Sequence, residues 1–133
     1  MKDLLWDEFQ DAVHQGLIRH RSILDVTSKF QEASVRVSRA LVKSVTTCGC
    51  VQINAHKNEI PSALDVPLTE LRSYMDDHLD GELCANCREV VEEELGRLLF
   101  YTAAFAGLLD INVYDVLIKE HKKLAALGLY HLS

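Results

Sequence analysis

The sequence predicts an all-α fold of four or five helices in one domain, residues 1–133. Over most of the chain, apolar residues recur at intervals of three and four, which places them on one face of a helix. Only six glycines and two prolines occur among the 133 residues, so we expect few turns and long elements. No set of alternating segments is large enough for a sheet core. The composition, 48% hydrophobic and 26% charged, is typical of a globular domain.

Two helices are expected in the first third of the chain. Over residues 4–13 the apolar positions share one face, and this first helix should end near Gly16. Ser22, with Asp25 three residues later, resembles a capping box and predicts the start of a second helix. The helical period behind it continues to about Val45, so the second helix is long.

The middle of the chain is less regular. Residues 46–67 lose the helical period, which predicts an irregular loop with a small β-turn or hairpin at the alternating run 51–54. Pro67 is tolerated in a first helical turn and predicts a shorter helix over residues 67–79, with Gly81 beyond its end.

Two more helices complete the prediction. The fourth follows Cys87 and is apolar on more than one face after Leu98. Such a helix is buried either against its own core and a second subunit, or wholly within its own chain. Asn112 with Asp115 forms another variant capping box for a last helix, which Gly128 should close.

The charge pattern narrows the classes of partner. The formal charge is −6, and residues 59–97 carry eleven acidic side chains against three basic ones. An acidic surface repels a phosphate backbone, so no nucleic-acid binding is expected, whereas divalent cations are compatible with it. The longest apolar run, residues 98–109, is short of the ~20 residues that cross a bilayer, so no membrane span is expected. The first residues lack the pattern of a secretory signal, which favours the cytoplasm.

The four cysteines form a C-x-C pair and a C-x-x-C pair: Cys48, Cys50, Cys84 and Cys87. Two close pairs of thiolates are a common way to hold tetrahedral zinc. One pair follows the second helix and the other starts the fourth, where a helix N-terminus favours thiolate charge. The pattern predicts a structural zinc clamp between helix ends. An iron–sulfur cluster, a regulatory disulfide and four ordinary thiols remain alternatives.

Two histidines lie between the cysteine pairs. His56 and His78 could each replace a cysteine as a ligand, although an exposed histidine in a loop or at a helix end is the commoner meaning. A closed site with four sulfur ligands leaves no position for substrate, so the ion would stabilise the fold and not catalyse.

Charged side chains form a row on each of two predicted helices. In the second helix Glu32, Arg36, Arg39 and Lys43 share a face, and in the fourth helix Glu89, Glu93 and Arg97 do so. The simplest interpretation of both rows is surface ion pairs, each worth a few tenths of a kcal/mol.

Two segments of the chain resemble the MazG-like nucleotide pyrophosphohydrolases. Residues 93–101, continued by 110–112 and 119–123, are similar to the second half of that family, and residues 29–32 are similar to the entry to its first motif. The resemblance implies an all-α bundle that is dimeric or larger. It also implies hydrolysis of nucleoside triphosphates to monophosphate and pyrophosphate, with Mg²⁺ held by an EExxE motif on one helix and an ExxD motif on the next.

Both motifs are altered within the segments that the resemblance covers, residues 22–46 and 88–127. The first reads Glu32-Ala33-Ser34-Val35-Arg36, and the second reads Glu94-Leu95-Gly96-Arg97. Two acidic positions of the family are therefore arginines. Magnesium requires oxygen ligands, whereas a guanidinium offers only hydrogen-bond donors, so these substitutions argue against a Mg²⁺ site.

Arg36 and Arg97 then have two roles open to them. They can pair across the helices with Glu94 and Glu32 as a salt-bridge cluster, or they can contact phosphates directly. We favour the cluster, because an enzyme without its metal loses the group that orients the attacking water.

Three functions are consistent with these patterns. The preferred one is a MazG-like homodimer, stabilised by zinc, that has lost hydrolysis and binds a nucleotide or a partner. The others are an active pyrophosphohydrolase on an atypical nucleotide and a zinc-stabilised adaptor without ligand. No catalytic residue is assigned. The candidate phosphate- or nucleotide-binding residues are Glu32, Arg36, Glu93, Glu94, Arg97 and Lys123.

Overall fold

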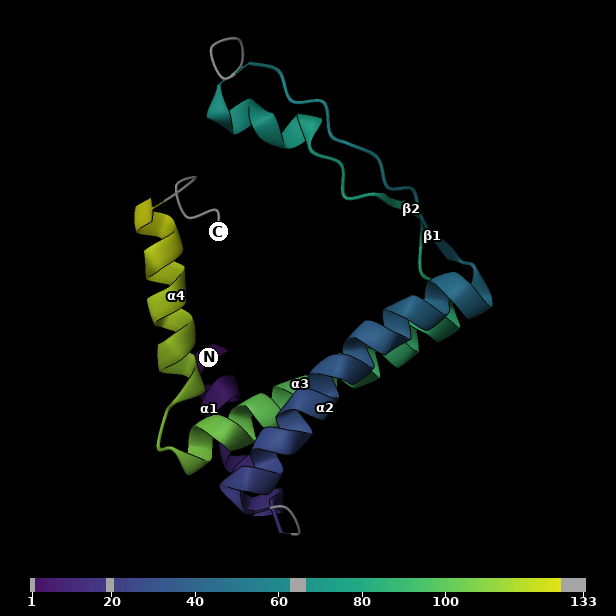
Figure 1. Cartoon of the computed structure of the whole chain (residues 1–133). Helices are drawn as coiled ribbons and strands as arrows, with labels where there is room; N and C mark the ends of the chain where they lie inside the picture. Colours follow the sequence, from purple (N-terminus) through teal and green to yellow (C-terminus); the bar gives the residue numbers. More distant parts are fainter. Residues whose placement is uncertain (1, 19–20, 63–66, 128–133) are drawn as a thin grey trace.

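The computed structural model describes residues 2–18, 21–62 and 67–127 and confirms a mostly helical chain. Two long helices run antiparallel, side by side, and form a hairpin (Figure 1). α1 and α4 lie at one end of this hairpin, and an arm extends from the other. The elements in chain order are α1 (Lys2–Gly16), α2 (Ile23–Lys43), the π-helical turn η1 (Ser44–Cys48), β1 (Val51–Ile53), the 3₁₀ helix η2 (Leu68–Tyr74), β2 (Leu79–Gly81), α3 (Ala85–Leu108) and α4 (Val113–Leu127).

The two predicted helix starts are confirmed. The Ser22 hydroxyl accepts a hydrogen bond from the backbone N–H of Leu24 at 3.3 Å, at the start of α2. The Asn112 side-chain oxygen accepts one from the N–H of Asp115 at 3.0 Å, at the start of α4. Each bond satisfies a backbone donor that has no partner within the helix. The expected end of the last helix at Gly128 lies outside the described residues.

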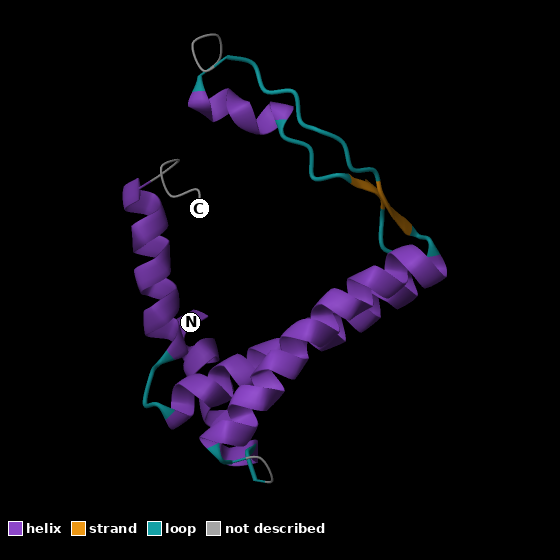
Figure 2. Ribbon diagram, viewed as in Figure 1, coloured by secondary structure: helices purple, strands orange, loops and turns teal. Residues whose placement is uncertain are grey.

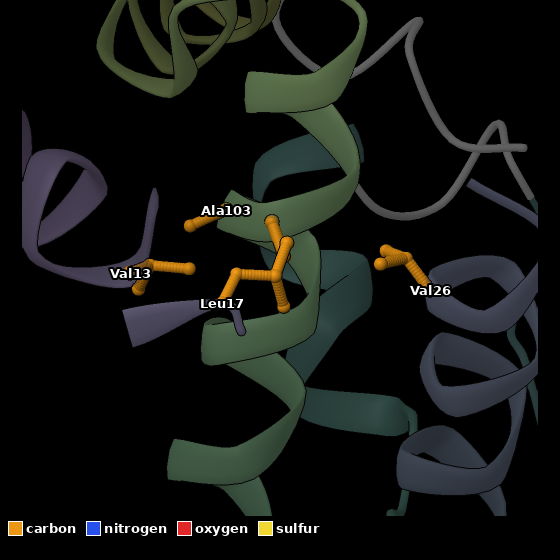
Figure 3. Close-up of a cluster of buried hydrophobic side chains, with 5 residues drawn as sticks. Val13, Leu17, Val26 and Ala103 are labelled. Atoms are coloured by element: carbon orange, nitrogen blue, oxygen red, sulfur yellow. The ribbon is translucent and has the colours of Figure 1, made fainter. Parts of the chain in front are cut away.

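The hydrophobic core lies at the end of the hairpin where α1 packs. Its buried members come from α1, the following loop, α2 and α3; Figure 3 labels four of the five. Val26 is fully buried, and phenylalanines from α1 and α3 surround the cluster. This end of the molecule therefore carries most of the apolar stabilisation. The cluster comprises Val13, Leu17, Val26, Ala103 and Ala104.

Small residues line the contact between α2 and α3. Val26, Ala33 and Ala40 are buried at intervals of seven, and Ser44 follows four residues later with only 2% of its surface exposed. The interval of seven keeps one stripe of α2 facing its neighbour. Alanine at these positions lets the backbones of α2 and α3 approach closely. The two helices therefore stay in contact along residues 33–44, which lie outside the apolar core.

The helix predicted over residues 67–79 is wrong in its second half. Only Leu68–Tyr74 is helical, as a 3₁₀ helix, and the chain then extends. The side chains of Asp76 and Asp77 accept hydrogen bonds from the backbone N–H groups two residues ahead. These local bonds compete with helical ones, because aspartate offers the backbone an alternative partner. His78 adopts a left-handed conformation, with φ at 61°, which ends any continuation.

The small β-turn or hairpin expected at residues 51–54 is present only as one strand, and the partner of that strand is distant in sequence. β1 pairs antiparallel with β2, and the two short strands cross at the base of the arm (Figure 2). In this register Val51 faces Gly81 and Ile53 faces Leu79. Gly81 is therefore a strand residue and not the residue that follows a helix. The two strands and the segment between them form the arm. Of the loop predicted for residues 46–67, residues 46–48 belong to the π-helical turn and 51–53 to β1, residues 54–62 are irregular as expected, and residues 63–66 lie outside the described residues.

Within the part of the chain that the structure describes, α3 is not wrapped on all sides. Leu95 and Leu99, on the outer face of α3, are 43% and 46% exposed. Of the two interpretations of this apolar helix, the central buried one is wrong. Within the described residues no helix is by itself long and apolar enough to cross a membrane; α3 and α4 meet those limits only when joined across a bend of 104°.

Candidate functional site

The four cysteines meet where the helical hairpin joins the arm. Cys48 ends the π-helical turn that follows α2, and Cys50 lies just before β1. Cys84 is the N-terminal capping residue of α3, and Cys87 lies in its first turn. Because α2 and α3 run antiparallel, the end of one and the start of the other lie together, as the sequence predicted.

Two glycines with positive φ shape the backbone around the cysteines. Gly49, with φ at 80°, turns the chain between Cys48 and Cys50. Gly81, with φ at 84°, lies against Cys50, and a Cβ on it would come within 2.6 Å of the Cys50 carbonyl oxygen. The β1–β2 pairing therefore holds the first cysteine pair in place only because residue 81 has no side chain.

The sulfur positions fit a single ion. The four Sγ atoms lie within 4.8 Å of one another, and the Sγ atoms of Cys48 and Cys84 are 3.9 Å apart. Zinc–sulfur bonds of about 2.3 Å in a tetrahedron place the sulfurs roughly 3.8 Å apart. All four thiols are free, since a disulfide requires about 2.05 Å. The cluster can bind a metal ion.

The four thiols do not hold their protons equally. The pKa of Cys84 falls to about 7, because its sulfur accepts a hydrogen bond from the backbone N–H of Cys87 and another from the Cys87 thiol. The Ser44 side chain lowers the pKa of Cys87, but the hydrogen bond to Cys84 and burial outweigh it and raise that pKa to about 12. One thiolate is thus available near neutral pH, and metal binding must displace the remaining protons.

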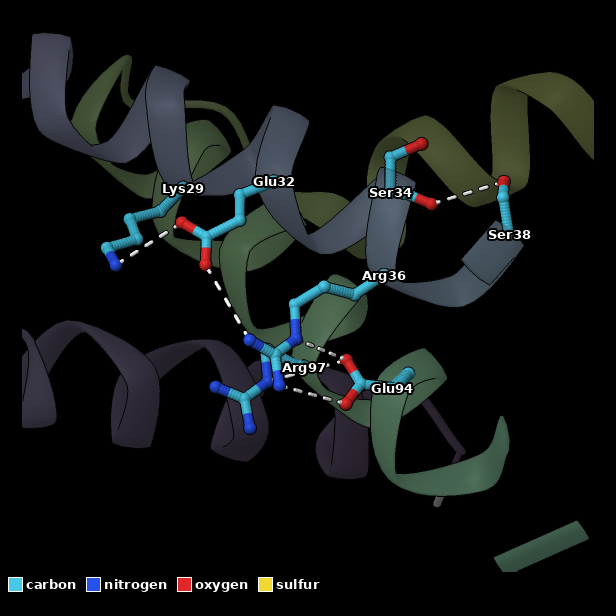
Figure 4. Close-up of polar contacts among 7 residues, drawn as sticks. All are labelled: Lys29, Glu32, Ser34, Arg36, Ser38, Glu94 and Arg97. Atoms are coloured by element: carbon cyan, nitrogen blue, oxygen red, sulfur yellow. Dashed lines mark hydrogen bonds and ion pairs between the residues drawn. The ribbon is translucent and has the colours of Figure 1, made fainter. Parts of the chain in front are cut away.

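The arginine cluster lies farther along the hairpin, between α2 and α3 (Figure 4). The Arg36 side chain donates from Nε to Glu94 Oε2 at 2.9 Å and from Nη2 to Glu94 Oε1 at 3.4 Å. Glu32 lies 3.8 Å from Arg36 on the same helix, and Lys29 contacts Glu32. The Glu94 side chain is 12% exposed, and its hydrogen bond to Arg36 lowers the pKa of this carboxyl. The predicted pairing of Arg36 with Glu94 is confirmed.

Other predicted site residues lie differently. Arg97 approaches Glu94 of its own helix at 3.8 Å, and not Glu32 across the hairpin. Glu93 is exposed on α3, and Lys123 is exposed on α4, which packs against α1. Neither is among the described residues that line a groove over α2 and α3 next to Arg36, which is described below. Their assignment to a common site with Arg36 is therefore not supported by the geometry.

That groove, about 550 Å³ in volume, lies over α2 and α3. The sequence placed Arg39 and Lys43 on the same helix face as Arg36 but did not assign them to a site. Both line the groove, together with apolar side chains from each helix. The regular spacing of the three cations was the signal, since residues three to four apart share a helix face. The lining residues are Glu32, Val35, Arg36, Arg39, Ala40, Lys43, Val90 and Glu94.

The two histidines lie with each other and not with the cysteines. His56 Nε2 lies 2.9 Å from Asp76 Oδ2, and the rings of His56 and His78 are 4.9 Å apart. Neither replaces a cysteine ligand. Asp76 was not singled out from the sequence, because its position opposite His56 depends on the pairing of two distant strands.

Comparisons with protein-family models, with curated proteins and with solved structures found no match to this chain. The resemblance to MazG-like enzymes therefore stays a prediction. The chemistry open to the cysteine and arginine clusters rests on their geometry.

Proposed function

We propose that this chain is a zinc-stabilised helical module of MazG-like type that binds a phosphate-bearing ligand, such as a nucleotide, and has lost magnesium-dependent hydrolysis. The observation that carries the proposal is the position of the Arg36 guanidinium. It lies between Glu32 and Glu94, at the edge of a groove with two further cations.

The charge of the cluster disfavours Mg²⁺. Lys29, Arg36 and Arg97 contribute three positive charges within ion-pair distance of the two carboxylates of Glu32 and Glu94. Mg²⁺ needs carboxylate or phosphate oxygens that are free to bind it. Here Glu94 already accepts two hydrogen bonds from Arg36, so a metal would have to displace a charged partner.

The groove has the chemistry of an anion site. Among the described residues, no ion pair or hydrogen bond engages the side chains of Arg39 and Lys43, and both line the groove with Arg36. Val35 and Val90 add apolar surface. A volume of about 550 Å³ is within the usual range of small-molecule sites, about 300–1,000 Å³. Guanidinium and ammonium groups beside apolar surface suit a phosphate joined to a base.

Zinc is the metal that the cysteine cluster fits best. Four thiolates in tetrahedral array are typical of structural zinc, and a closed site of this kind contributes folding free energy. The same sulfurs can hold an iron–sulfur cluster, and a protein with such a cluster absorbs visible light, whereas a zinc protein is colourless. Elemental analysis of protein purified without chelator distinguishes them: a zinc content that falls by about one per chain in Cys84→Ser supports the proposal, and iron or an apo protein contradicts it.

Binding is tested by thermal shift and calorimetry with ATP, ADP and pyrophosphate, each with and without Mg²⁺. We expect stabilisation without Mg²⁺, of about 2.7 kcal/mol at a ligand concentration of 100 Kd. Arg39→Ala should abolish this shift, whereas Arg72→Ala, on the exposed surface of the arm, should keep it. No stabilisation of the parent by any of the three ligands would refute ligand binding and favour the adaptor function.

Hydrolysis is tested separately. Pyrophosphate release from a panel of nucleoside triphosphates in Mg²⁺ should stay at the level of the buffer control. Turnover by the parent that disappears in Glu94→Ala would refute the loss of catalysis and establish the active pyrophosphohydrolase instead.

We also propose that a second copy of the chain covers the outer face of α3. The accessible surface of the isolated chain is 10326 Å², whereas a compact monomer of 15.0 kDa has roughly 7,000 Å². The excess is roughly 3,300 Å² per chain, more than the roughly 1,000–2,500 Å² that each partner of an obligate dimer buries; the projecting arm contributes part of it, and the exposed face of α3 contributes another part (Figure 1). Light scattering should show a dimer for the parent and a monomer for Leu99→Asp. The matched change Ile60→Asp, at an exposed position of the arm, should leave the dimer intact.

A further inference from the structure

The arm brings a second set of metal-ligating side chains to one face of its two extended segments. β1 and β2 pair Val51 with Gly81 and Ile53 with Leu79. Beyond them the backbone N–H of Asn54 donates to the carbonyl of His78 at 2.9 Å, so the same register continues outward. Two residues further, this register sets His56 opposite Asp76. The ring of His78 lies on the same side, with its centroid 4.9 Å from that of His56.

The three side chains converge. One ligand atom from each of His56, Asp76 and His78 lies within 4.8 Å of the others. His56 Nε2 is 2.9 Å from Asp76 Oδ2, and the two imidazole rings meet edge to face with centroids 4.9 Å apart. Two imidazoles and a carboxylate are a common ligand set for divalent transition metals.

The surrounding hydrogen bonds fix which atoms face the centre. The backbone carbonyl of Lys57 lies 3.3 Å from His56 Nδ1, which leaves Nε2 as the ligand nitrogen. The backbone N–H of His78 donates to Asp76 Oδ1 at 3.2 Å, which leaves Oδ2. The N–H of Asp76 donates in turn to the Asn58 side chain at 3.1 Å. Each of these two ligands is thus oriented by a second contact, as in known metal sites.

His78 supplies the observation that an ion pair alone does not explain. A salt bridge between His56 and Asp76 accounts for their 2.9 Å contact. It leaves without a role the buried His78 Nε2, which has no hydrogen-bond partner among the described residues. Buried polar nitrogens without partners are uncommon and costly. His78 is moreover held with φ at 61°, a conformation that a non-glycine residue adopts at a cost.

This cluster is separate from the four cysteines. The two groups have no residue in common, and His56 lies beyond the end of β1, whereas Cys50 lies just before its start. We propose that His56, Asp76 and His78 form a second, surface site for a divalent transition metal ion such as Zn²⁺. Three protein ligands leave at least one coordination position for water or a further ligand, unlike the closed set of four sulfurs.

Metal stoichiometry tests the proposal on the full chain. Protein first loaded with one equivalent of Zn²⁺ at the cysteines is titrated with Zn²⁺ by calorimetry. We expect the parent to bind a second equivalent. His56→Gln, Asp76→Asn and His78→Asn should keep the first zinc and weaken the second by at least about tenfold. Asparagine is chosen at position 78 because it tolerates positive φ.

A control excludes adventitious binding by surface histidines. The double variant His14→Gln/His121→Gln, with both changes at exposed helix positions, should still bind two equivalents. Cobalt gives a second readout, because only the thiolate site produces sulfur-to-metal charge transfer. A parent that binds one equivalent, or an Asp76→Asn variant that binds two with parental affinity, would overturn the proposal.

Discussion

Replacing Gly81 by alanine should uncouple the arm from the cysteine cluster. The new Cβ would lie 2.6 Å from the carbonyl oxygen of Cys50, closer than Cβ atoms approach oxygen in proteins, and that oxygen belongs to rigid backbone. The residue would also have to adopt φ near 84°. The left-handed conformation costs an L-residue about 1–2 kcal/mol. Relieving an overpacked contact costs about 1–3 kcal/mol more.

Two other glycines separate these contributions. Gly49 has φ at 80° but open space around its Cβ position, so Gly49→Ala should cost only the conformational part, about 1–2 kcal/mol. Gly96 is helical, has open space and has no positive φ, so Gly96→Ala should stabilise by about 0.5–1 kcal/mol. Gly81→Ala should therefore be the most damaging of the three, at about 2–5 kcal/mol.

The measurement is chemical and thermal unfolding of the three variants with saturating zinc, together with their zinc affinities. One kcal/mol corresponds to about 3–5 °C in Tm for a chain of this size. Gly81→Ala should also weaken zinc binding, because the displaced backbone carries the Cys50 thiolate. If Gly81→Ala is no more destabilising than Gly49→Ala, the close approach of Gly81 to Cys50 does not exist in solution.

The remaining predictions concern the metal and the arginine cluster. Cys84→Ser should lower Tm far more than a surface substitution, because it deletes one of four ligands; excess chelator should abolish the difference, and equal melting temperatures with zinc present would contradict the clamp. Arg36 lowers the pKa of Glu94, so the stability that this pair contributes is complete above the ordinary carboxyl pKa of about 4.3 and is lost as pH falls through the lowered value. The deficit of Glu94→Gln in unfolding free energy should therefore shrink in acid, whereas the exposed matched change Glu93→Gln should show little deficit at any pH. Arg97→Asp alone should not restore magnesium-dependent hydrolysis, since Arg36 remains hydrogen-bonded to Glu94. Measurable turnover by this variant would show that the altered first motif does not prevent Mg²⁺ binding.

Much of the helical framework was predictable, because its signals are local. Ser22 and Asn112 mark helix starts through bonds to residues two or three positions ahead, and the spacing of apolar residues repeats within each helix. The cysteine cluster was also predictable, since each pair is local and the antiparallel hairpin brings the pairs together.

The predictions that failed concern contacts between residues distant in sequence, or a competition between side-chain and helical hydrogen bonds within a short segment. Residues 75–79 carry a helix-like apolar pattern, but Asp76 and Asp77 bind the backbone ahead of them and end the helix. The pairing of residue 56 with residue 76 depends on a strand register that no local pattern encodes. Lys123 was assigned by resemblance alone, and nothing local to α4 could place it relative to α2.

The cysteine cluster lies where the chain passes from the helical hairpin into residues 51–83 and back again. None of the described residues of the arm belongs to the buried apolar cluster near α1, so the order of the arm rests on short-range bonds and on the sulfur ligands. Removing the ion should open this region as a unit while the helices stay closed. Amide hydrogen exchange would then divide the molecule into two populations, with zinc availability setting how often the distal one unfolds.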